Sequence, residues 1–464
     1  MELRSGHSLR SSQQQREDRI SALPDDLLIL VLAGLRCTAA AARTGVLSRR
    51  WRGLWTGLHQ IVFCDVALAS LEAALGSIDC PAVSLVEIRV PQRQIPEDRW
   101  PDPAVVDSLL RAAARLAPEK FVFHLQCIST NAELPCFYRA TSIVLDSRIL
   151  FLRVPTGVEF PVLETLSLSG CLVNLDTLLS RCPRLRMFRL KIKCLWSRKQ
   201  DLTVHSASLQ ELVVQDQASW IQHVHILAPS LKQLTISLMA SNSEVTISVL
   251  APMLEKVSWY CRYTGWYVAF GLWRLEQLRL QTAERQGQLP SLHIHACTRS
   301  RILHGEAVKF TREIEKHMVV AFSVLELYLK TSGHVYGALV FHLFGIDRIR
   351  NDMQRLKIFL QKSMVEDRCP PDCPCVPTNW RSQTIFLTAL EEVEIHRFEG
   401  GEHEIDFLKL IFECAPMLTR MNVKLSHKAS ATSSNNGCTK IYNIFGAYPS
   451  VESCSHCFSS TLEL

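Results

Sequence analysis

The sequence contains one cluster of residues that could bind a metal, Cys369-Pro-Pro-Asp-Cys373-Pro-Cys375. Closely spaced cysteine thiolates are typical zinc ligands, and a tetrahedral site needs a fourth ligand. That ligand would come from Cys454, Cys457 or a distant histidine, because neither cysteine group repeats the spacing of a zinc ribbon. Prolines at 370, 371, 374 and 377 instead indicate a stiff loop. We therefore favour a thiol-bearing loop without metal, and we expect no cofactor.

No arrangement of residues in the sequence is typical of an enzyme active site. The glycines are scattered, without the GxGxxG or phosphate-loop spacing that nucleotide-binding enzymes need. His223 and His225, and His293 and His295, alternate along expected strands, which is typical of solvent-facing positions. We expect a protein without catalytic residues. A metal-dependent enzyme built on the cysteine cluster is the least favoured alternative.

Length, composition and charge describe an ordinary globular chain. Its 464 residues suggest either several domains or one elongated repeat array. Hydrophobic residues at 47% and charged residues at 21% exclude wholesale disorder. The net charge of +6 is spread along the chain, with one short basic cluster at Arg49-Arg50-Trp51-Arg52. We therefore expect no nucleic-acid partner.

Cysteine usage and the N-terminal segment predict the compartment. The seventeen cysteines are an odd number and lie mostly in apolar runs, which favours reduced thiols. Residues 1–17 are polar, without the apolar core of a signal peptide, and we expect them to be disordered. The apolar stretch Leu27–Leu35 is far shorter than the roughly 20 residues of a membrane span. These features predict a soluble cytoplasmic or nuclear protein that binds no membrane.

Residues 18–58 have the pattern of a small helical module. Pro24 followed by two aspartates suits the first turn of a helix, and apolar residues from Leu27 to Leu35 recur at helical spacing. Thr38 and Ser48 predict the starts of a second and a third helix. Three helices in about 40 residues form a thin core. We therefore expect the module to share apolar surface with a partner or with the next domain.

Two motifs in this module are Leu23-Pro24-Asp25-Asp26-Leu27-Leu28 and Val46-Leu47-Ser48-Arg49-Arg50-Trp51-Arg52. With this spacing, the module resembles an F-box over its full length. The resemblance implies docking on the Skp-type adaptor of a cullin-RING ubiquitin ligase. It assigns the contact to Leu23, Pro24, Leu27, Leu28, Leu32, Val46, Leu47 and Trp51. A place in the module's own core is the alternative for each of them.

The middle of the chain repeats one apolar pattern. Six segments carry apolar residues at their first, fourth and sixth positions, and they begin at 163, 185, 209, 231, 254 and 275. Steps of 21 to 24 residues are typical of leucine-rich repeats. Weaker copies occur at 85–90, 141–145, 325–329, 353–360, 390–395 and 418–423. The predicted fold class is α/β: a three-helix F-box followed by an irregular leucine-rich-repeat solenoid, with one strand per repeat and helical or loop return segments.

Outward positions on these strands form the expected binding face. Side chains alternate along a strand, so the residues that flank the last apolar position of each repeat point to the concave side. The predicted target-binding residues are Arg189, Lys191, Gln215, Tyr260, Arg279 and Gln281. The three cations among them favour an acidic ligand. A solvated face without a partner stays the alternative.

Another set of motifs lies near the C-terminus: Trp380-Arg381, Leu390-Glu-Glu-Val-Glu-Ile395, Phe398-Glu-Gly400 and Ala415-Pro-Met-Leu418. They resemble the FBD segment of plant proteins that open with an F-box and continue with leucine-rich repeats. Residues 404–414 have the spacing of an amphipathic helix that would close the repeat stack. The expected domains are 1–17 disordered, 18–58 F-box, 59–380 solenoid with a Cys/Pro-rich loop at 366–380, 381–425 FBD, and 426–464 low-complexity linker and tail.

Together these features resemble a plant F-box protein with leucine-rich repeats and a C-terminal FBD-type segment. The resemblance implies a non-catalytic substrate-recognition subunit of an SCF-type cullin-RING ubiquitin ligase. Its partners would be the Skp-type adaptor, through it a cullin, and an unknown target protein. The alternative is a leucine-rich-repeat interaction scaffold that acts outside a ubiquitin ligase.

The cysteine cluster at 369–375 gives a testable prediction. A closed zinc site would hold about one zinc per chain and would lose stability on chelation. We expect the purified protein to contain less than stoichiometric metal, and its thermal unfolding to be unchanged by EDTA. Elemental analysis that finds one tightly held zinc per chain would overturn the interpretation of this segment as a metal-free loop.

Overall fold

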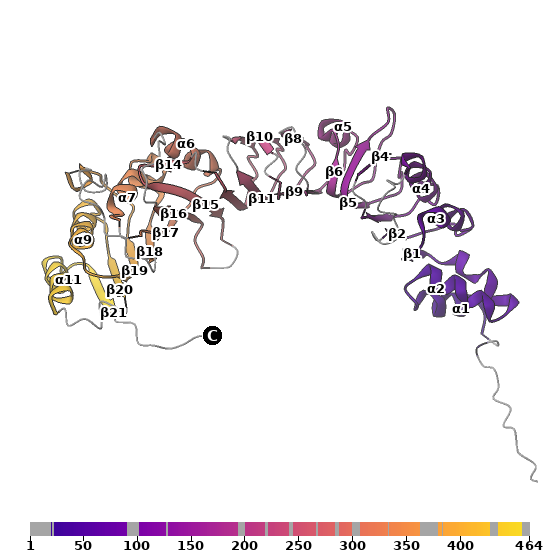
Figure 1. Ribbon diagram of the computed structural model, residues 1–464, viewed down its shortest axis with the longest axis horizontal. Helices are drawn as coiled ribbons and strands as arrows, with labels where there is room; N and C mark the ends of the chain where they lie inside the picture. The colour runs from indigo at the N-terminus through magenta and orange to yellow at the C-terminus, as the bar shows by residue number, and fades with distance from the viewer. Residues whose placement is uncertain are drawn as a thin grey trace, which may run out of the picture.

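The computed structural model describes residues 20, 23–90, 102–126, 129–193, 200–218, 221–240, 245–265, 268–283, 287–298, 307–332, 334–361, 379–382, 384–426 and 435–456. The cysteine cluster at 369–375, Cys457 and residues 1–17 lie outside this set. The chain forms an arch, with the small helical module at one end and the C-terminal elements at the other (Figure 1).

The helical module contains two α-helices, α1 (Asp25–Ala33) and α2 (Thr38–Arg43). The third helix expected after Ser48 is instead two 3-10 turns, Arg49–Arg52 and Leu54–Gly57. Gly53 separates them, and glycine costs more backbone entropy in a helix than other residues do. Thr38 does not cap α2 but lies inside it, where its hydroxyl accepts a hydrogen bond of 2.8 Å from the backbone N–H of Val62. This bond ties the module to the first strand.

Within the described chain, sixteen strands follow one another in chain order through the main sheet, each paired with the next. They are β1 (Gln60–Cys64), β2 (Leu85–Val90), β3 (Lys120–Leu125), β5 (Ser142–Arg153), β6 (Thr165–Leu172), β7 (Met187–Ile192), β9 (Glu211–Asp216), β11 (Gln233–Ala240), β13 (Lys256–Tyr263), β15 (Trp273–Gln281), β16 (Ser291–Thr298), β17 (Val324–Lys330), β18 (Arg355–Gln361), β19 (Glu392–Phe398), β20 (Arg420–Leu425) and β21 (Glu452–His456). Two short strands, β4 (Thr130–Glu133) and β14 (Ala269–Phe270), pair with β5 and β15. The predicted solenoid is therefore present, including the weaker repeats.

Helices cover the outer rim of the arch over much of its length (Figure 1). They are α3 (Leu68–Gly76), α4 (Pro103–Arg115), α5 (Leu175–Ser180), α6 (Ala307–His317), α7 (Gly337–Phe344), α8 (Asp347–Asp352), α9 (Glu402–Cys414) and α11 (Asn435–Ala447). No helix in the described residues combines the length and the apolar character needed to cross a membrane.

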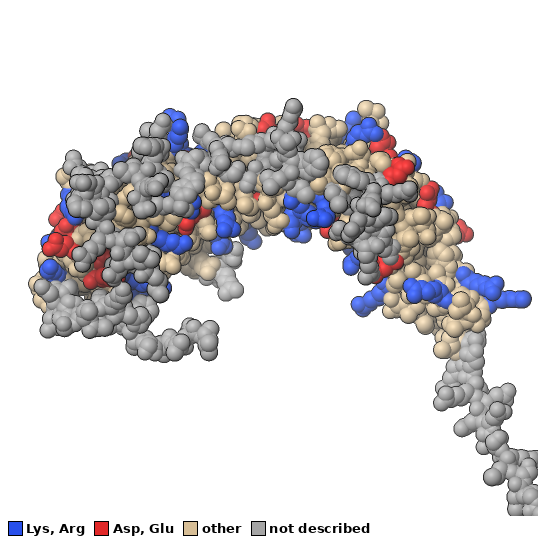
Figure 2. All heavy atoms as spheres, in the orientation of Figure 1, with Lys and Arg blue, Asp and Glu red and all other residues tan. Residues whose placement is uncertain are grey.

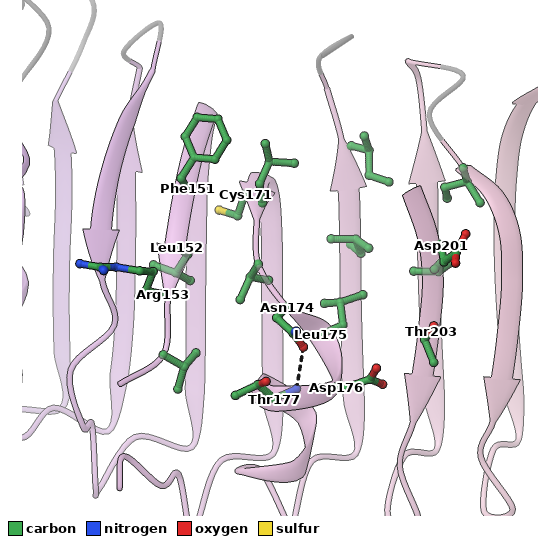
Figure 3. A pocket seen from close by; sticks show the side chains of 17 residues that line it. Phe151, Leu152, Arg153, Cys171, Asn174, Leu175, Asp176, Thr177, Asp201 and Thr203 are labelled. Carbon is green, nitrogen blue, oxygen red and sulfur yellow. Dashed lines mark hydrogen bonds between the residues drawn. The ribbon is translucent and has the colours of Figure 1, made fainter. Parts of the chain in front are cut away.

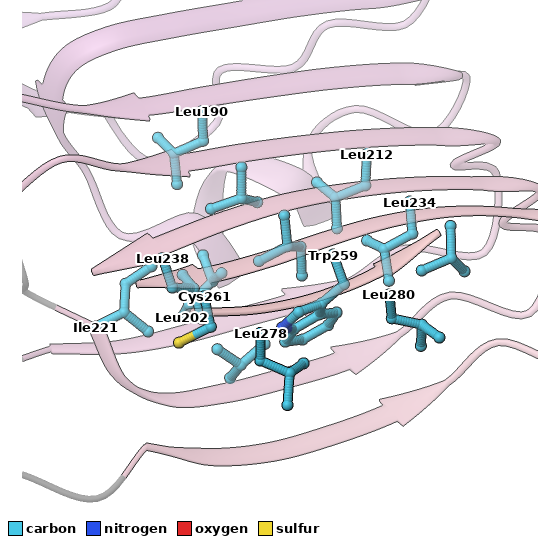
Figure 4. Close-up of a cluster of buried hydrophobic side chains, with 14 of the residues drawn as sticks. Leu190, Leu202, Leu212, Ile221, Leu234, Leu238, Trp259, Cys261, Leu278 and Leu280 are labelled. Atoms are coloured by element: carbon cyan, nitrogen blue, oxygen red, sulfur yellow. The ribbon is translucent and has the colours of Figure 1, made fainter. Parts of the chain in front are cut away.

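In the middle of the arch the return segments are strands, which corrects the expectation of helices or loops. The strands β8 (Gln200–His205), β10 (Ile221–Leu227) and β12 (Thr246–Leu250) form a second parallel sheet. Their apolar residues alternate with polar ones, and Leu202 and Ile226 are buried. Period-two alternation suits a strand with one buried face. Figure 4 shows Leu202 and Ile221 of this layer in one cluster with the leucines of the main sheet.

The predicted strand register is confirmed by burial. Leu166, Leu190 and Leu278 are at most 5% exposed, whereas the residues beside them, such as Lys191 and Arg279, are partly or fully exposed. Each strand therefore sends one set of side chains into the core between the layers and the other set to the concave face.

One strand runs against the direction that the repeats predict. β15 pairs antiparallel with both β13 and β16, although its apolar residues keep the repeat spacing. Only nine residues separate Tyr263 at the end of β13 from Trp273 at the start of β15, and β14 lies among them. A parallel pair needs a crossover of about a dozen residues or more, so the chain turns back in a hairpin instead.

The FBD-like segment contains a strand, a helix and a strand, as predicted. In α9, Phe407, Leu408 and Ile411 are fully buried. The carboxylate of Glu404, 2% exposed, accepts hydrogen bonds from the backbone N–H groups of Glu399 and Gly401 at 2.9 and 3.1 Å. These bonds satisfy donors at the start of the helix, which would otherwise lack partners.

The repeat stack continues beyond residue 425, into the region expected to be a linker and tail. β21 pairs with β20 in parallel, and α11 packs against α9. Ile441 and Ile444 are buried, and the ring of Phe412 stacks on that of Tyr448 with centroids 4.6 Å apart. The low-complexity composition before residue 437 makes the start of α11 hard to recognise in the sequence. The apolar side chains of this helix become stabilising only when they pack against α9.

Strand alternation gives a prediction for two neighbouring positions on one strand. Leu190→Ala opens a core cavity and is expected to destabilise the protein by about 2 to 5 kcal/mol. Lys191→Ala, one residue away, changes a surface position and is expected to alter stability by no more than about 0.5 kcal/mol. Urea denaturation followed by circular dichroism measures both. A tolerated leucine change beside a damaging lysine change would show that the strand register is shifted by one residue.

Candidate functional site

The first candidate site is an apolar surface on the helical module. Seven of the fourteen exposed large hydrophobic side chains in the described residues belong to it: Ile20, Leu27, Leu30, Val31, Leu35, Val46 and Leu47. Helix α1 carries two apolar stripes, because Leu28 and Leu32 face the core while Leu27 and Val31 face solvent. Residues four apart lie on one side of a helix, so the second stripe is continuous. Such a concentration of apolar surface is typical of a protein interface.

The eight residues predicted to contact the adaptor divide into two groups. Leu27, Val46 and Leu47 are exposed, as is Pro24, and Leu23 is partly exposed. The other three residues, Leu28, Leu32 and Trp51, lie in the core of the module and present no surface to a docked protein. Sequence reasoning omitted the exposed residues Ile20, Leu30, Val31 and Leu35. The signal that could have separated the two stripes is that α1 contains two sets of apolar residues at a spacing of four, Leu27 with Val31 and Leu28 with Leu32.

An ion pair holds the two F-box-like motifs together. The guanidinium of Arg50 donates hydrogen bonds to the carboxylate of Asp25 at 2.7 and 2.8 Å, and also to the backbone carbonyl of Leu23. The short basic cluster therefore serves partly to position the start of α1. Both side chains are substantially exposed, so we assign the pair a positioning role and no large stabilisation.

The second candidate site is the concave face of the main sheet. All six predicted target-binding residues lie on outward positions there: Arg189, Lys191, Gln215, Tyr260, Arg279 and Gln281. Arg189 is paired with Glu211 at 3.4 Å. Within the described residues, Lys191, Arg262 and Arg279 have no carboxylate partner. Figure 2 shows lysine and arginine atoms gathered along the inner edge of the arch.

Arg262 was not among the predicted residues, although it occupies an outward position on β13, in the row next to that of Tyr260. The registers of the sheet pair Tyr260 with Arg279 and Arg262 with Gln277. The reversed direction of β15 therefore places Arg279 beside Tyr260, and Arg262 lies two residues further along β13. Sequence spacing alone could not give this neighbourhood, because it assumes a parallel pair.

An aromatic ladder, which we define as His295, Tyr328, Phe359 and His396, crosses four neighbouring strands of the concave face. Successive ring centroids lie 4.3, 4.7 and 4.3 Å apart, with interplanar angles of 7°, 7° and 27°. The parallel registers of β16 to β19 place the four residues directly beside one another. Burial lowers the pKa of both histidines, so the imidazoles stack in their neutral form at pH 7. Sequence reasoning missed this ladder, since its successive members are 31 to 37 residues apart.

Beside the ladder runs a row of alternating charges. Glu326 contacts His293 at 3.2 Å and Lys357 at 3.5 Å, and it accepts a hydrogen bond of 2.7 Å from the hydroxyl of Tyr328. The hydrogen bond from His293 is the main cause that lowers the pKa of Glu326 to about 2. In the next strands Glu394 pairs with Lys424. This part of the face is therefore close to electrically neutral, unlike the cationic part at β7 to β15.

A cavity of about 920 Å³ opens between the ends of β5 to β7 and the second sheet (Figure 3). Apolar side chains such as Leu172 and Ile192 line it together with polar ones such as Asp176 and Asp201. Asn174 accepts a hydrogen bond of 3.0 Å from the backbone N–H of Thr177 and thereby starts α5. Arg153 is paired with Glu133 at 2.9 Å. The described lining residues include no nucleophile hydrogen-bonded to a base, and we assign no chemistry to the cavity.

One further titratable cluster in the described residues is buried. Tyr263 hydrogen-bonds to His317 at 2.8 Å and to Glu313 at 3.2 Å, and all three side chains are at most 3% exposed. This network attaches α6 to β13 and is closed to a ligand. Burial also raises the pKa of the Cys171 and Cys261 thiols to about 12. The ten cysteines whose side chains the structure describes form no disulfide, and the described residues include no cluster that could hold a metal ion.

Two family models match the chain. Residues 106–262 match the LRR repeats of the FBD-associated F-box protein At5g56370, and residues 385–423 match FBD. The second match covers β19, α9 and the start of β20, which are the elements that carry the predicted FBD resemblance.

Curated relatives come from Arabidopsis thaliana. The putative F-box/LRR-repeat protein At4g15060 is 28% identical over 233 residues, which cover 46% of this chain and 54% of the relative. The F-box/FBD/LRR-repeat protein At3g51530 is 27% identical over 249 residues, covering 50% and 52%. The F-box/FBD/LRR-repeat protein At2g04230 is 50% identical over 52 residues, or 11% of each chain. The chain thus spans about half the length of the first two relatives.

The solenoid and the FBD elements agree with the two family matches in order and in content. The chain therefore contains LRR repeats of the FBD-associated F-box type and an FBD, and it is similar to F-box/LRR-repeat and F-box/FBD/LRR-repeat proteins of Arabidopsis thaliana.

Proposed function

We propose that the protein is a substrate-recognition subunit of an SCF-type cullin-RING ubiquitin ligase. Its helical module binds a Skp-type adaptor, which links it to a cullin, and its concave face binds a target protein. The chain itself carries out no chemistry. Its contribution is proximity, because holding the target beside the ubiquitin carrier raises the effective concentration of the target's lysines.

The observation that carries the proposal is the apolar surface on the helical module. A thin module with seven exposed large hydrophobic side chains is stabilised by burying them against a partner. The names of the Arabidopsis relatives, which contain F-box and LRR-repeat, agree with this assignment. In Figure 1 the module lies at the opposite end of the arch from the C-terminal elements, so one partner can bind there and leave the concave face open.

Adaptor binding is tested by changing exposed residues only. Leu27, Val46 and Leu47 are 44%, 87% and 69% exposed, so replacing all three by alanine removes contact area without opening the core. Each loss is worth at least about 1.5 kcal/mol if the side chain is buried at the interface. The affinity for a Skp-type adaptor is therefore expected to fall at least about a hundredfold, as measured by isothermal titration calorimetry.

A matched control is available on the solenoid. Leu227, Leu250 and Met253 are 43%, 56% and 55% exposed, and their replacement by alanine is expected to leave adaptor binding unchanged. Leu28 and Trp51 are unsuitable for the test, since they are buried and their loss would disturb the module's own core. Unchanged adaptor affinity in a folded variant of the first triple would instead favour a repeat scaffold that acts outside a ubiquitin ligase.

A further inference from the structure

The concave face has two parts of different chemistry that lie end to end. Lys191, Arg262 and Arg279 span β7 to β15 without carboxylate partners in the described residues, and the aromatic ladder spans β16 to β19. Because neighbouring strands lie about 4.8 Å apart, the distance from Lys191 across to Arg279 is about 19 Å, and Phe359 lies about 14 Å further on. Both parts belong to adjacent outward rows of one continuous sheet.

The cationic part attracts an anion. Exposed charges that already have partners gain little from a ligand. Three cations that lack a carboxylate partner among the described residues act together on the concave surface. Beside Lys191 the face is also hollowed, in a recess of about 390 Å³ that Ser167, Ser169 and Gln215 help to line. These hydroxyl and amide groups lie next to Lys191 and Arg189 and can donate hydrogen bonds to a carboxylate or a phosphate.

The aromatic ladder favours an aromatic or aliphatic side chain of the ligand. Its rings cover one another face to face, so between neighbours only ring edges are turned toward solvent. The edge of an aromatic ring carries partial positive charge, which disfavours a lysine or arginine and favours the face of another ring. The carbon surface of the rings also favours burial of an aliphatic group. The neighbouring charges of Glu326 and Lys357 offset one another. A nucleic-acid base would need an open ring face for stacking, and the interior of the ladder offers none.

We infer that the concave face takes an extended polypeptide segment of about ten residues, with anionic side chains at one end and an aromatic or aliphatic side chain at the other. At about 3.3 Å per residue, ten residues span the roughly 34 Å between Lys191 and Phe359. An apolar residue that contacts Phe359 lies about four residues from an anionic residue at Arg279, which matches the roughly 14 Å between these two positions. The inference rests on the proposed function only in treating this face as the target-binding surface.

The test is a selection from a displayed library of random twelve-residue peptides on the full-length protein. We expect enriched peptides to combine a block of aspartate or glutamate with a separate phenylalanine, tyrosine or leucine. The best peptide is then synthesised with either its acidic residues or phosphoserine at those positions, and the tighter form identifies carboxylate or phosphate as the anion. Enrichment of basic peptides, or of no sequence, would overturn the inference. So would displacement of the peptide by equimolar single-stranded RNA.

Variants locate the two ends of the peptide. Lys191→Glu, Arg262→Glu and Arg279→Glu together are expected to weaken its binding at least tenfold, with a loss that shrinks at high salt. Reversal of the exposed cations Arg111 and Lys409 on the covering helices α4 and α9, and of Arg184 in a turn, changes the net charge equally and is expected to have no such effect.

The ladder is tested separately. Phe359→Ala is expected to weaken peptide binding at least tenfold at any salt concentration. Tyr328→Phe keeps the aromatic ring and is expected to retain peptide binding. If neither the charge reversal nor Phe359→Ala weakens peptide binding, the inference is overturned. Adaptor capture by the same preparation tests the proposed function separately. If the protein captures the adaptor but enriches no peptide, only the inference is contradicted. If it enriches the peptide but captures no adaptor, only the proposed function is contradicted.

Discussion

The hydrogen bonding of each strand of the main sheet to both of its neighbours is the constraint on which the molecule depends. A single repeat has one strand and a return segment and cannot bury its apolar side alone, so its stability comes from the repeats on either side. Because the pairing runs in chain order from β1 to β21, the chain must stack as an arch. Alternation then decides for every strand which residues build the core and which reach the concave face.

The same constraint creates the aromatic ladder. No two of its residues are close in sequence, and their rings meet only because β16 to β19 pair in parallel without a register shift over those positions. A shift of one residue in any of these strands would turn its ladder residue into the core. The reversed strand β15 keeps its apolar residues inward, so the outward rows continue across it even though the chain direction changes.

The two candidate sites differ in how the fold supports them. The helical module has a thin core around Leu28, Leu32 and Trp51 and leaves a second apolar stripe in solvent. The concave face instead lies on a deep core, where Trp259 and Leu278 are fully buried (Figure 4). A thin core favours gaining stability from a partner, whereas a deep one holds outward side chains in a fixed arrangement before any ligand arrives. The first surface is therefore suited to a constant partner and the second to selecting a target.

The sequence by itself determined the repeat architecture. The spacing of 21 to 24 residues between repeats and the period-two alternation of apolar and polar residues are local patterns, which can be recognised without the tertiary structure. It also determined the inward and outward sets, as Leu190 and Lys191 illustrate. It could not determine the direction of β15, which depends on how a short connection closes, or the strands of the second sheet. The division of α1 between Leu28 inside and Leu27 outside, and the meeting of Tyr328 with Phe359, were decided only by the tertiary structure. Both depend on contacts between residues distant in sequence, and no local pattern encodes which partner a side chain will meet.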